Sequence, residues 1–148
     1  MNDESAPATI LVADDEPDIV ALTSRRLARS GFTVITAVNG EEALQASREQ
    51  KPDLALLDIS MPKLTGVEVS RLLRAAPETH ATPVILMSAG LFDKLTIPDD
   101  ADAFIAKPFG ALELPALVRE VLGREQRVTP ADSLPEPPVA AMGRAASA

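Results

Sequence analysis

The feature that most constrains this chain is a short apolar run, Leu54-Ala55-Leu56-Leu57, that ends directly in the carboxylate Asp58. The run does not alternate between apolar and polar residues, which is typical of a strand buried on both faces of a parallel sheet. Sheets of that kind bind ligands at the carboxyl ends of their strands. Asp58 is therefore the first candidate for chemistry, although an aspartate that merely caps a turn would explain an isolated case.

Strand and helix patterns alternate along the rest of the chain. Gly31 and Gly123 are typical helix ends, and Pro115 is compatible only with the first turn of a helix. The alternation predicts a parallel sheet with helices on both faces. The predicted strands are 9–13, 32–37, 54–58, 83–87 and 103–106, and the predicted helices are 17–30, 41–50, 66–74 and one from about 111–113 to 122.

Length and composition predict one globular domain with additional chain at both ends. We expect a polar arm over residues 1–7, the domain over 8–123, and a disordered tail rich in proline and alanine over 124–148. The chain has no cysteine, no apolar run long enough to span a membrane and no secretory signal, so we expect a cytoplasmic protein. Its net charge of −8 argues against binding to nucleic-acid phosphates.

Polar side chains end four of the predicted strands. Clustered carboxylates repel one another and favour a hard divalent cation such as Mg2+, which leaves coordination sites for phosphate oxygens. A lysine and a serine hydroxyl can bind further phosphoryl oxygens, and a carboxylate can act as the nucleophile. The residues that meet at this edge are predicted to be Asp14, Asp15, Asp58, Ser88 and Lys107.

Each of these residues has a simpler explanation when taken alone. The acids Asp14 and Asp15 precede a predicted helix and could favour its dipole, Lys107 could be a solvated loop residue, and Ser88 could cap a strand end. Their combination, in order and at successive strand ends, favours the functional interpretation. His80 has no second histidine to act with and is interpreted as a surface residue.

Motifs around these residues resemble those of the response-regulator receiver domain, the phosphoacceptor module of two-component signalling. The resemblance covers about residues 8–123 and implies a flavodoxin-like five-stranded parallel sheet in the order 2-1-3-4-5. It also implies phosphorylation by a histidine kinase or a histidine phosphotransfer protein. The motifs are Asp14-Asp15, Asp58 followed by Met61-Pro62 and Gly66, Ser88-Ala89, and Lys107-Pro108-Phe109.

The resemblance implies a role for each site residue. Asp58 is the implied phosphoacceptor. Asp15 and Asp58 are implied to ligate Mg2+ directly, together with the main-chain carbonyl of Ser60, whereas Asp14 acts largely through bound water. Lys107 is implied to pair with the phosphoryl group.

Two further residues are implied to switch conformation. Ser88 is the hydroxyl that moves toward the phosphoryl group, and Phe104 is the aromatic side chain that swings inward behind it. The Lys107-Pro108 bond is implied to be cis. Ser60 and Gly90 are small residues at positions that tune the lifetime of the acyl phosphate, so we expect a short-lived phosphorylated form.

The chain departs from the family between Ser88 and Lys107. Residues 90–98 contain little helix-favouring sequence, so we expect a shortened or irregular fourth helix. We expect a stand-alone receiver, because only 25 residues follow 8–123, acting on an unidentified downstream protein as a monomer or weak dimer. We expect no enzymatic activity other than its own phosphoryl transfer and slow autodephosphorylation.

Two alternatives remain open at this point. A haloacid-dehalogenase-like phosphatase also uses an aspartate nucleophile, but it wants a second aspartate two residues later, where this chain has Ser60. A pseudo-receiver would bind partners without phosphorylation, and the complete acidic set argues against it.

Overall fold

The computed structural model describes residues 7–89 and 101–127. The chain divides into two compact units, Met1–Val118 and Arg119–Ala148. The first unit contains the sheet, and α4 begins in it and continues into the second. The elements are β1 (Thr9–Ala13), α1 (Pro17–Arg29), β2 (Thr33–Ala37), α2 (Gly40–Gln50), β3 (Leu54–Asp58), α3 (Gly66–Ala75), β4 (Val84–Ser88), β5 (Ala103–Ala106) and α4 (Glu113–Arg127).

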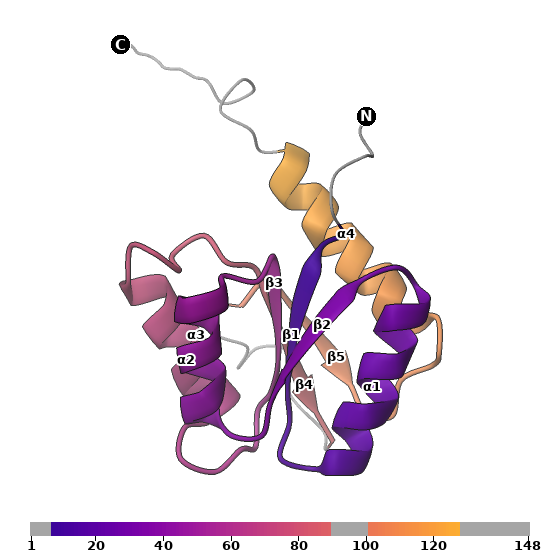
Figure 1. The fold of residues 1–148 in the computed structure, drawn as a ribbon, viewed down its shortest axis with the longest axis horizontal. Helices are drawn as coiled ribbons and strands as arrows, with labels where there is room; N and C mark the ends of the chain where they lie inside the picture. The colour runs from indigo at the N-terminus through magenta and orange to yellow at the C-terminus, as the bar shows by residue number, and fades with distance from the viewer. Residues whose placement is uncertain (1–6, 90–100, 128–148) are drawn as a thin grey trace. The chain divides into compact units, whose positions relative to one another are not determined.

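The five strands form one parallel sheet in the order β2-β1-β3-β4-β5, which confirms the predicted fold class. Helices α2 and α3 cover one face of the sheet, and α1 lies on the other (Figure 1). The expected short fourth helix falls on residues 90–100 and lies outside the described residues. None of the helices in the described ranges is long and apolar enough to cross a membrane.

Helix boundaries follow the local sequence, with one correction. Pro17 is the first residue of α1, and Gly31 after that helix adopts a φ of 98°, as a stop residue does. Pro115 lies in the first turn of α4, as expected. The predicted end of this helix at Gly123 is wrong, because α4 continues to Arg127. A glycine inside a helix costs only about 1 kcal/mol, which the neighbouring helix-forming residues can offset.

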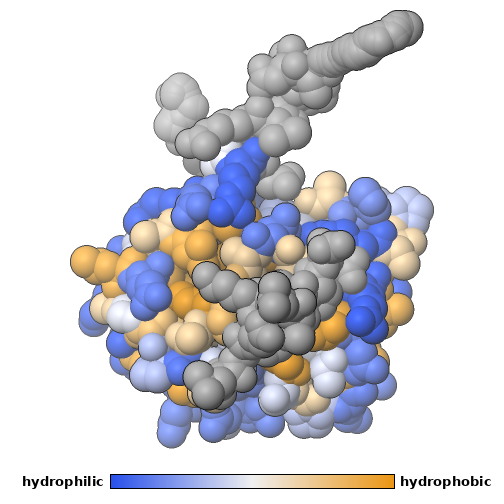
Figure 2. Space-filling model, turned by 180° about the vertical axis from the view of Figure 1, so that it is seen from behind, coloured by the Kyte–Doolittle hydropathy of each residue, from blue (hydrophilic) through white to orange (hydrophobic). Residues whose placement is uncertain are grey.

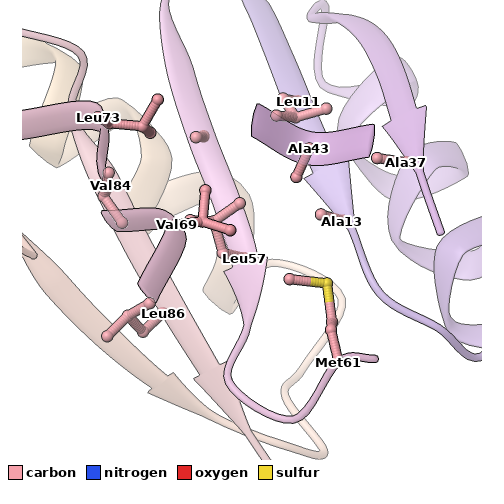
Figure 3. Packing of buried hydrophobic residues seen from close by; sticks show 11 residues of the cluster. Leu11, Ala13, Ala37, Ala43, Leu57, Met61, Val69, Leu73, Val84 and Leu86 are labelled. Atoms are coloured by element: carbon pink, nitrogen blue, oxygen red, sulfur yellow. The ribbon is translucent and has the colours of Figure 1, made fainter. Parts of the chain in front are cut away.

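Both faces of the sheet are buried, which explains the absence of alternation in its strands. Every residue of β3 is buried. Alternate residues of β1, β3 and β4 point toward α2 and α3 and pack with side chains from those helices and with Met61 (Figure 3). Residues of the intervening positions, such as Ile10, Leu56 and Met87, are fully buried on the opposite face. The core therefore holds the carboxyl ends of the central strands rigidly.

A few large hydrophobic side chains remain on the surface. Leu112, just before α4, is 81% exposed, and Leu22 on α1 and Leu72 on α3 are partly exposed. Figure 2 shows hydrophobic residues on the face opposite to the view in Figure 1. Leu22 and Leu72 do not form one patch, because α1 and α3 lie on opposite faces of the sheet, and singly exposed apolar residues are normal on protein surfaces.

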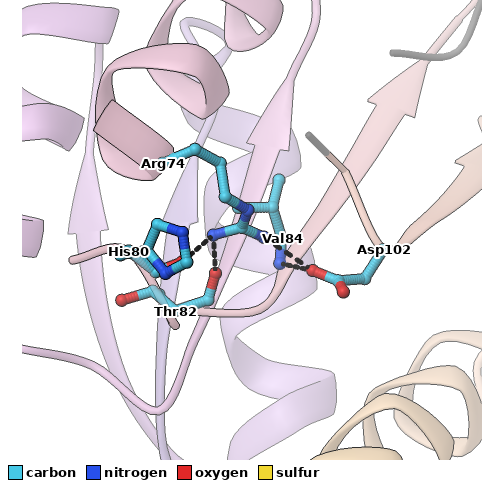
Figure 4. A network of polar contacts seen from close by, with 5 residues as sticks. All are labelled: Arg74, His80, Thr82, Val84 and Asp102. Carbon is cyan, nitrogen blue, oxygen red and sulfur yellow. Dashed lines mark hydrogen bonds and ion pairs between the residues drawn. The ribbon is translucent and has the colours of Figure 1, made fainter. Parts of the chain in front are cut away.

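A polar network joins the end of α3 to the starts of β4 and β5 (Figure 4). The Arg74 guanidinium donates hydrogen bonds to the carbonyls of His80 (3.0 Å) and Thr82 (2.5 Å). It also pairs with Asp102 at 2.8 Å. The same Asp102 oxygen accepts the Val84 amide at 2.8 Å. This network fixes the chain where β5 begins, at the end of the sheet remote from Asp58.

Replacing Arg74 is therefore expected to destabilise the domain. Arg74→Ala leaves two carbonyls and the Asp102 carboxylate without this donor, and we expect the free energy of unfolding to fall by about 1–3 kcal/mol. Urea denaturation measures the change. The control is Arg48→Ala, which removes an exposed arginine from the last turn of α2. Equal effects of the two substitutions would show that the network contributes nothing beyond an ordinary surface arginine.

Candidate functional site

The candidate site lies where β1 and β3 run side by side in the middle of the sheet. Asp14 and Asp15 follow β1, and Asp58 is the last residue of β3. Chain connections leave in opposite directions from these two strands, which is the point at which open α/β sheets bind ligands. One carboxylate oxygen of each of Asp14, Asp15 and Asp58 lies within 4.8 Å of the others. The structure thus brings together the three predicted acids.

Lys107 reaches this cluster from the end of β5. Its Nζ lies 2.6 Å from Asp14 Oδ2, 3.4 Å from Asp58 Oδ1 and 3.8 Å from Glu16 Oε1. Its backbone N–H donates to the Ser88 carbonyl at 2.7 Å, which places the residue directly beside the end of β4. The following Lys107-Pro108 peptide bond is cis, as expected.

Asp14 is completely buried and uses both carboxylate oxygens within the protein. Oδ1 accepts the backbone N–H of Glu16 at 3.0 Å, and Oδ2 pairs with Lys107. Asp15 is exposed, whereas only 7% of the Asp58 side chain is exposed. The three acids therefore differ in their freedom to bind a ligand: Asp14 is already engaged, and Asp15 faces solvent.

Burial and charge perturb the pKa of both central groups. Burial, followed by the negative charge of Asp14, raises the pKa of Asp58 from 3.8 to about 6, although Lys107 and the Ser60 amide oppose this rise. Burial lowers the pKa of Lys107, but the hydrogen bond to Asp14 and the charges of Asp58 and Asp14 outweigh it and raise the pKa overall. The raised pKa keeps Lys107 protonated at neutral pH, and its single charge does not balance the carboxylates around it.

A cleft of about 290 Å³ opens above these groups. Ser60 and Ser88 line it from the ends of neighbouring strands, so both predicted residues are at the site. Phe104 lies in β5, half-buried against the core under α2 and α3. His80 is exposed on the connection between α3 and β4, which confirms its interpretation as a surface residue. The lining residues are Asp15, Glu16, Asp58, Ser60, Ser88, Ala89 and Lys107.

The donor set fits a divalent cation. Three carboxylates and one ammonium leave net negative charge at one point, and burial together with the charge of Asp14 raises the pKa of Asp58 despite the nearby Lys107. Carboxylate oxygens that share a cleft with open solvent are the ligands Mg2+ prefers, because this ion retains several waters.

Two residues at or near the site, Glu16 and Arg26, were not predicted from the sequence. Glu16 contributes a carboxylate 3.8 Å from Lys107, and its position next to Asp14-Asp15 was a signal for it. Arg26 of α1 donates to the Phe109 carbonyl at 3.0 Å and so supports the turn that follows Lys107. No local sequence signal indicates that second contact, because 83 residues separate its partners.

The pKa of Asp58 predicts a pH-dependent stability. Its pKa is higher in the folded protein than its ordinary value, so its ionisation costs stability as pH rises from 3.8 to about 6. We expect Asp58→Asn to stabilise the metal-free protein above pH 6 by up to about 3 kcal/mol, and this gain to disappear as pH falls toward 4. Urea denaturation across this pH range measures it. A gain that is independent of pH would contradict the assignment.

Known proteins share both the sequence and the fold. Residues 10–119 match the response regulator receiver domain family. The alkaline phosphatase synthesis transcriptional regulatory protein PhoP of Bacillus subtilis is 41% identical over 128 residues, which are 84% of this chain and 52% of that protein. The transcriptional regulatory protein PrrA of Mycobacterium tuberculosis is 40% identical over 116 residues, 78% of this chain and 50% of that protein. The chain thus spans about half the length of these relatives.

Solved structures give the same result. The response regulator protein TrrA from Thermotoga maritima, in complex with Mg(2+)-BeF, has a TM-score of 0.71 and 35% identity, covering 77% of this chain and 98% of that one. The receiver domain of sensor histidine kinase PA1611 from Pseudomonas aeruginosa, with magnesium coordinated in its active-site cleft, has a TM-score of 0.73 and 25% identity, covering 80% and 99%. By its sequence and its fold, the chain belongs to the response regulator receiver domain family.

Proposed function

We propose that this receiver domain accepts a phosphoryl group on Asp58 from the phosphohistidine of a histidine kinase or histidine phosphotransfer protein. The phosphorylated form then changes its binding to a downstream protein. The observation that carries the proposal is the convergence of Asp58 with Lys107, at 3.4 Å, and with the two further carboxylates Asp14 and Asp15. Family membership favours this function over a phosphatase, as does Ser60 in place of a second aspartate.

Asp58 is the nucleophile in this proposal. One of its carboxylate oxygens attacks phosphorus, the bond from phosphorus to the donor's imidazole nitrogen breaks, and an acyl phosphate forms. Lys107 pairs with a phosphoryl oxygen, and its buried position keeps its charge unscreened. The domain itself slowly loses the phosphoryl group to water.

Mg2+ would be held by Asp15, Asp58 and the main-chain carbonyl of Ser60, with Asp14 acting through water. The engagement of both Asp14 oxygens by Glu16 and Lys107 supports this division of roles. When bound, the ion neutralises the charge that develops on the phosphoryl oxygens. Asp58 must be ionised both to hold the ion and to attack.

Ser88 and Phe104 are the proposed switch. Ser88 is half-buried at the cleft, and its carbonyl accepts the Lys107 amide. Phe104 pairs with Leu86 in the sheet, two residues before Ser88, so the two side chains belong to adjoining parts of one strand pair. A movement of the Ser88 hydroxyl toward the phosphoryl group would change the space available to Phe104.

Protein partners are proposed for this domain, and not nucleic acid. An apolar groove of about 330 Å³ adjoins the cleft, between α1 and the turn at Pro108 and Phe109, and it shares Glu16 and Lys107 with the cleft. This groove is the proposed docking surface for the protein that donates the phosphoryl group. The net charge of −8 opposes attraction to phosphate backbones. The stand-alone organisation, the domain bounds 8–123 and the cytoplasmic location stay predictions.

Acetyl phosphate tests the proposal without needing the natural kinase. We expect wild-type protein incubated with acetyl phosphate and Mg2+ to gain one phosphoryl group, and Asp58→Asn to gain none, because the amide is not a nucleophile. Intact mass spectrometry at neutral pH measures the change. The control is Asp53→Asn, an exposed aspartate just before the other end of β3, which should be modified as fully as wild type.

Two results would contradict the proposal. An unmodified wild-type protein would leave Asp58 without its proposed role, and modification of Asp58→Asn would place the phosphoryl group elsewhere. Steady hydrolysis of a phosphoester by the wild-type protein would instead favour the phosphatase alternative.

A further inference from the structure

We infer that Gly40, the first residue of α2, is a positioning residue for the Asp58 site. Its missing side chain lets the start of α2 pack directly on the β3–α3 loop (residues 59–65), and this contact fixes the main chain that carries Ser60. The inference rests on the proposed function, because Ser60 matters as the proposed carbonyl ligand of Mg2+. Gly40 itself lies outside the cleft and touches no reacting group.

Several contacts hold this loop, and a main-chain hydrogen bond joins it to the start of α2. At its start, the Ile59 amide donates to the Met87 carbonyl at 2.9 Å. At its end, the amide of Gly66 donates back to the Ile59 carbonyl at 3.1 Å. Between these ends, Met61 is buried in the core. Within the loop the Leu64 amide donates to the Pro62 carbonyl at 2.8 Å, and Lys63 pairs with Glu41 of α2 at 3.7 Å. The backbone of Gly40 adds a main-chain contact from α2, because its N–H donates to the Pro62 carbonyl at 3.2 Å.

Space alone requires glycine at this position. A Cβ on Gly40 would lie 2.6 Å from the Leu64 carbonyl carbon and 2.5 Å from Leu64 Cβ, and still closer to the Leu64 oxygen. These atoms are mostly main chain, so no side-chain rotation can relieve the overlap. Gly40 does not have the positive φ of Gly31, so alanine would fit the backbone conformation and fail only by collision.

The loop, and not the helix, is the part that would yield. Helix α2 is held on the sheet by Ala43 and Ser47, which are completely buried. Its first turn is also capped by Asn39, whose side chain accepts the Glu42 amide at 2.9 Å. A collision at Leu64 is therefore expected to displace residues 60–64, which includes the Ser60 carbonyl.

The test is Gly40→Ala, followed by NMR of the metal-free protein and a titration with MgCl2. We expect amide resonances to shift across residues 59–65, and Mg2+ to bind about tenfold more weakly, as is typical when the supports of metal ligands are removed. The matched control is Gly31→Ala. Alanine is strained at that φ of 98° but meets nothing within 4 Å, so this variant loses stability without touching the loop.

The control separates positioning from general destabilisation. Wild-type Mg2+ affinity in Gly31→Ala and weakened affinity in Gly40→Ala would support the inference. Equal affinities in both variants, or unchanged loop resonances in Gly40→Ala, would overturn it. Absence of Mg2+ binding by the wild-type protein would instead reject the proposed function, while the loop resonances of the metal-free variants would still decide the role of Gly40.

A second variant covers the case in which Gly40→Ala does not fold. Asn39→Ala removes the acceptor for the Glu42 amide and loosens the turn that carries Gly40, without adding an atom against the loop. We expect the same loop amides to shift and Mg2+ affinity to fall by a smaller factor. Unchanged loop resonances and affinity in a folded Asn39→Ala protein would contradict the inference.

Discussion

The contact on which the site depends is the pairing of one buried ammonium with two buried carboxylates. Lys107 Nζ lies 2.6 Å from Asp14 and 3.4 Å from Asp58, and these groups come from the ends of three different strands. Burying either carboxylate alone would cost several kcal/mol. The parallel sheet makes the pairing possible because its strand ends share one edge, and the double burial of the sheet holds that edge in place.

Lys107 neutralises only part of the negative charge at the site. Lys107 contacts Asp14 more closely than Asp58, and the pKa of Asp58 remains raised, to about 6. A carboxylate that is poorly satisfied in the resting protein gains from a bound cation and from transfer of a phosphoryl group. The arrangement that weakens the metal-free fold is thus the one that the proposed reaction uses.

Close packing of the backbone around two glycines also helps to position the residues near Asp58. Gly66 lies so close to the Asp58 carbonyl that no Cβ fits between them, and Gly40 has the same relation to Leu64. Gly66 thus lets the start of α3 pack closely on the end of β3, and Gly40 lets the start of α2 pack closely on the loop that follows β3. At the far end of the sheet, the Arg74–Asp102 pair fixes the start of β5, the strand that carries Lys107 to the site.

The sequence by itself determined the parallel sheet, its strands to within a residue or two and the polar groups at its edge, because apolar runs and helical periodicity are local patterns. It mistook Gly123 for a helix end, since a glycine signal is weak against a continuing helix. Only the tertiary structure decided that Lys107 lies closer to Asp14 than to Asp58, and that Gly40 packs directly against the loop after Asp58. Those contacts depend on strand register and on distances of a few tenths of an ångström between residues far apart in the chain, which no local pattern encodes.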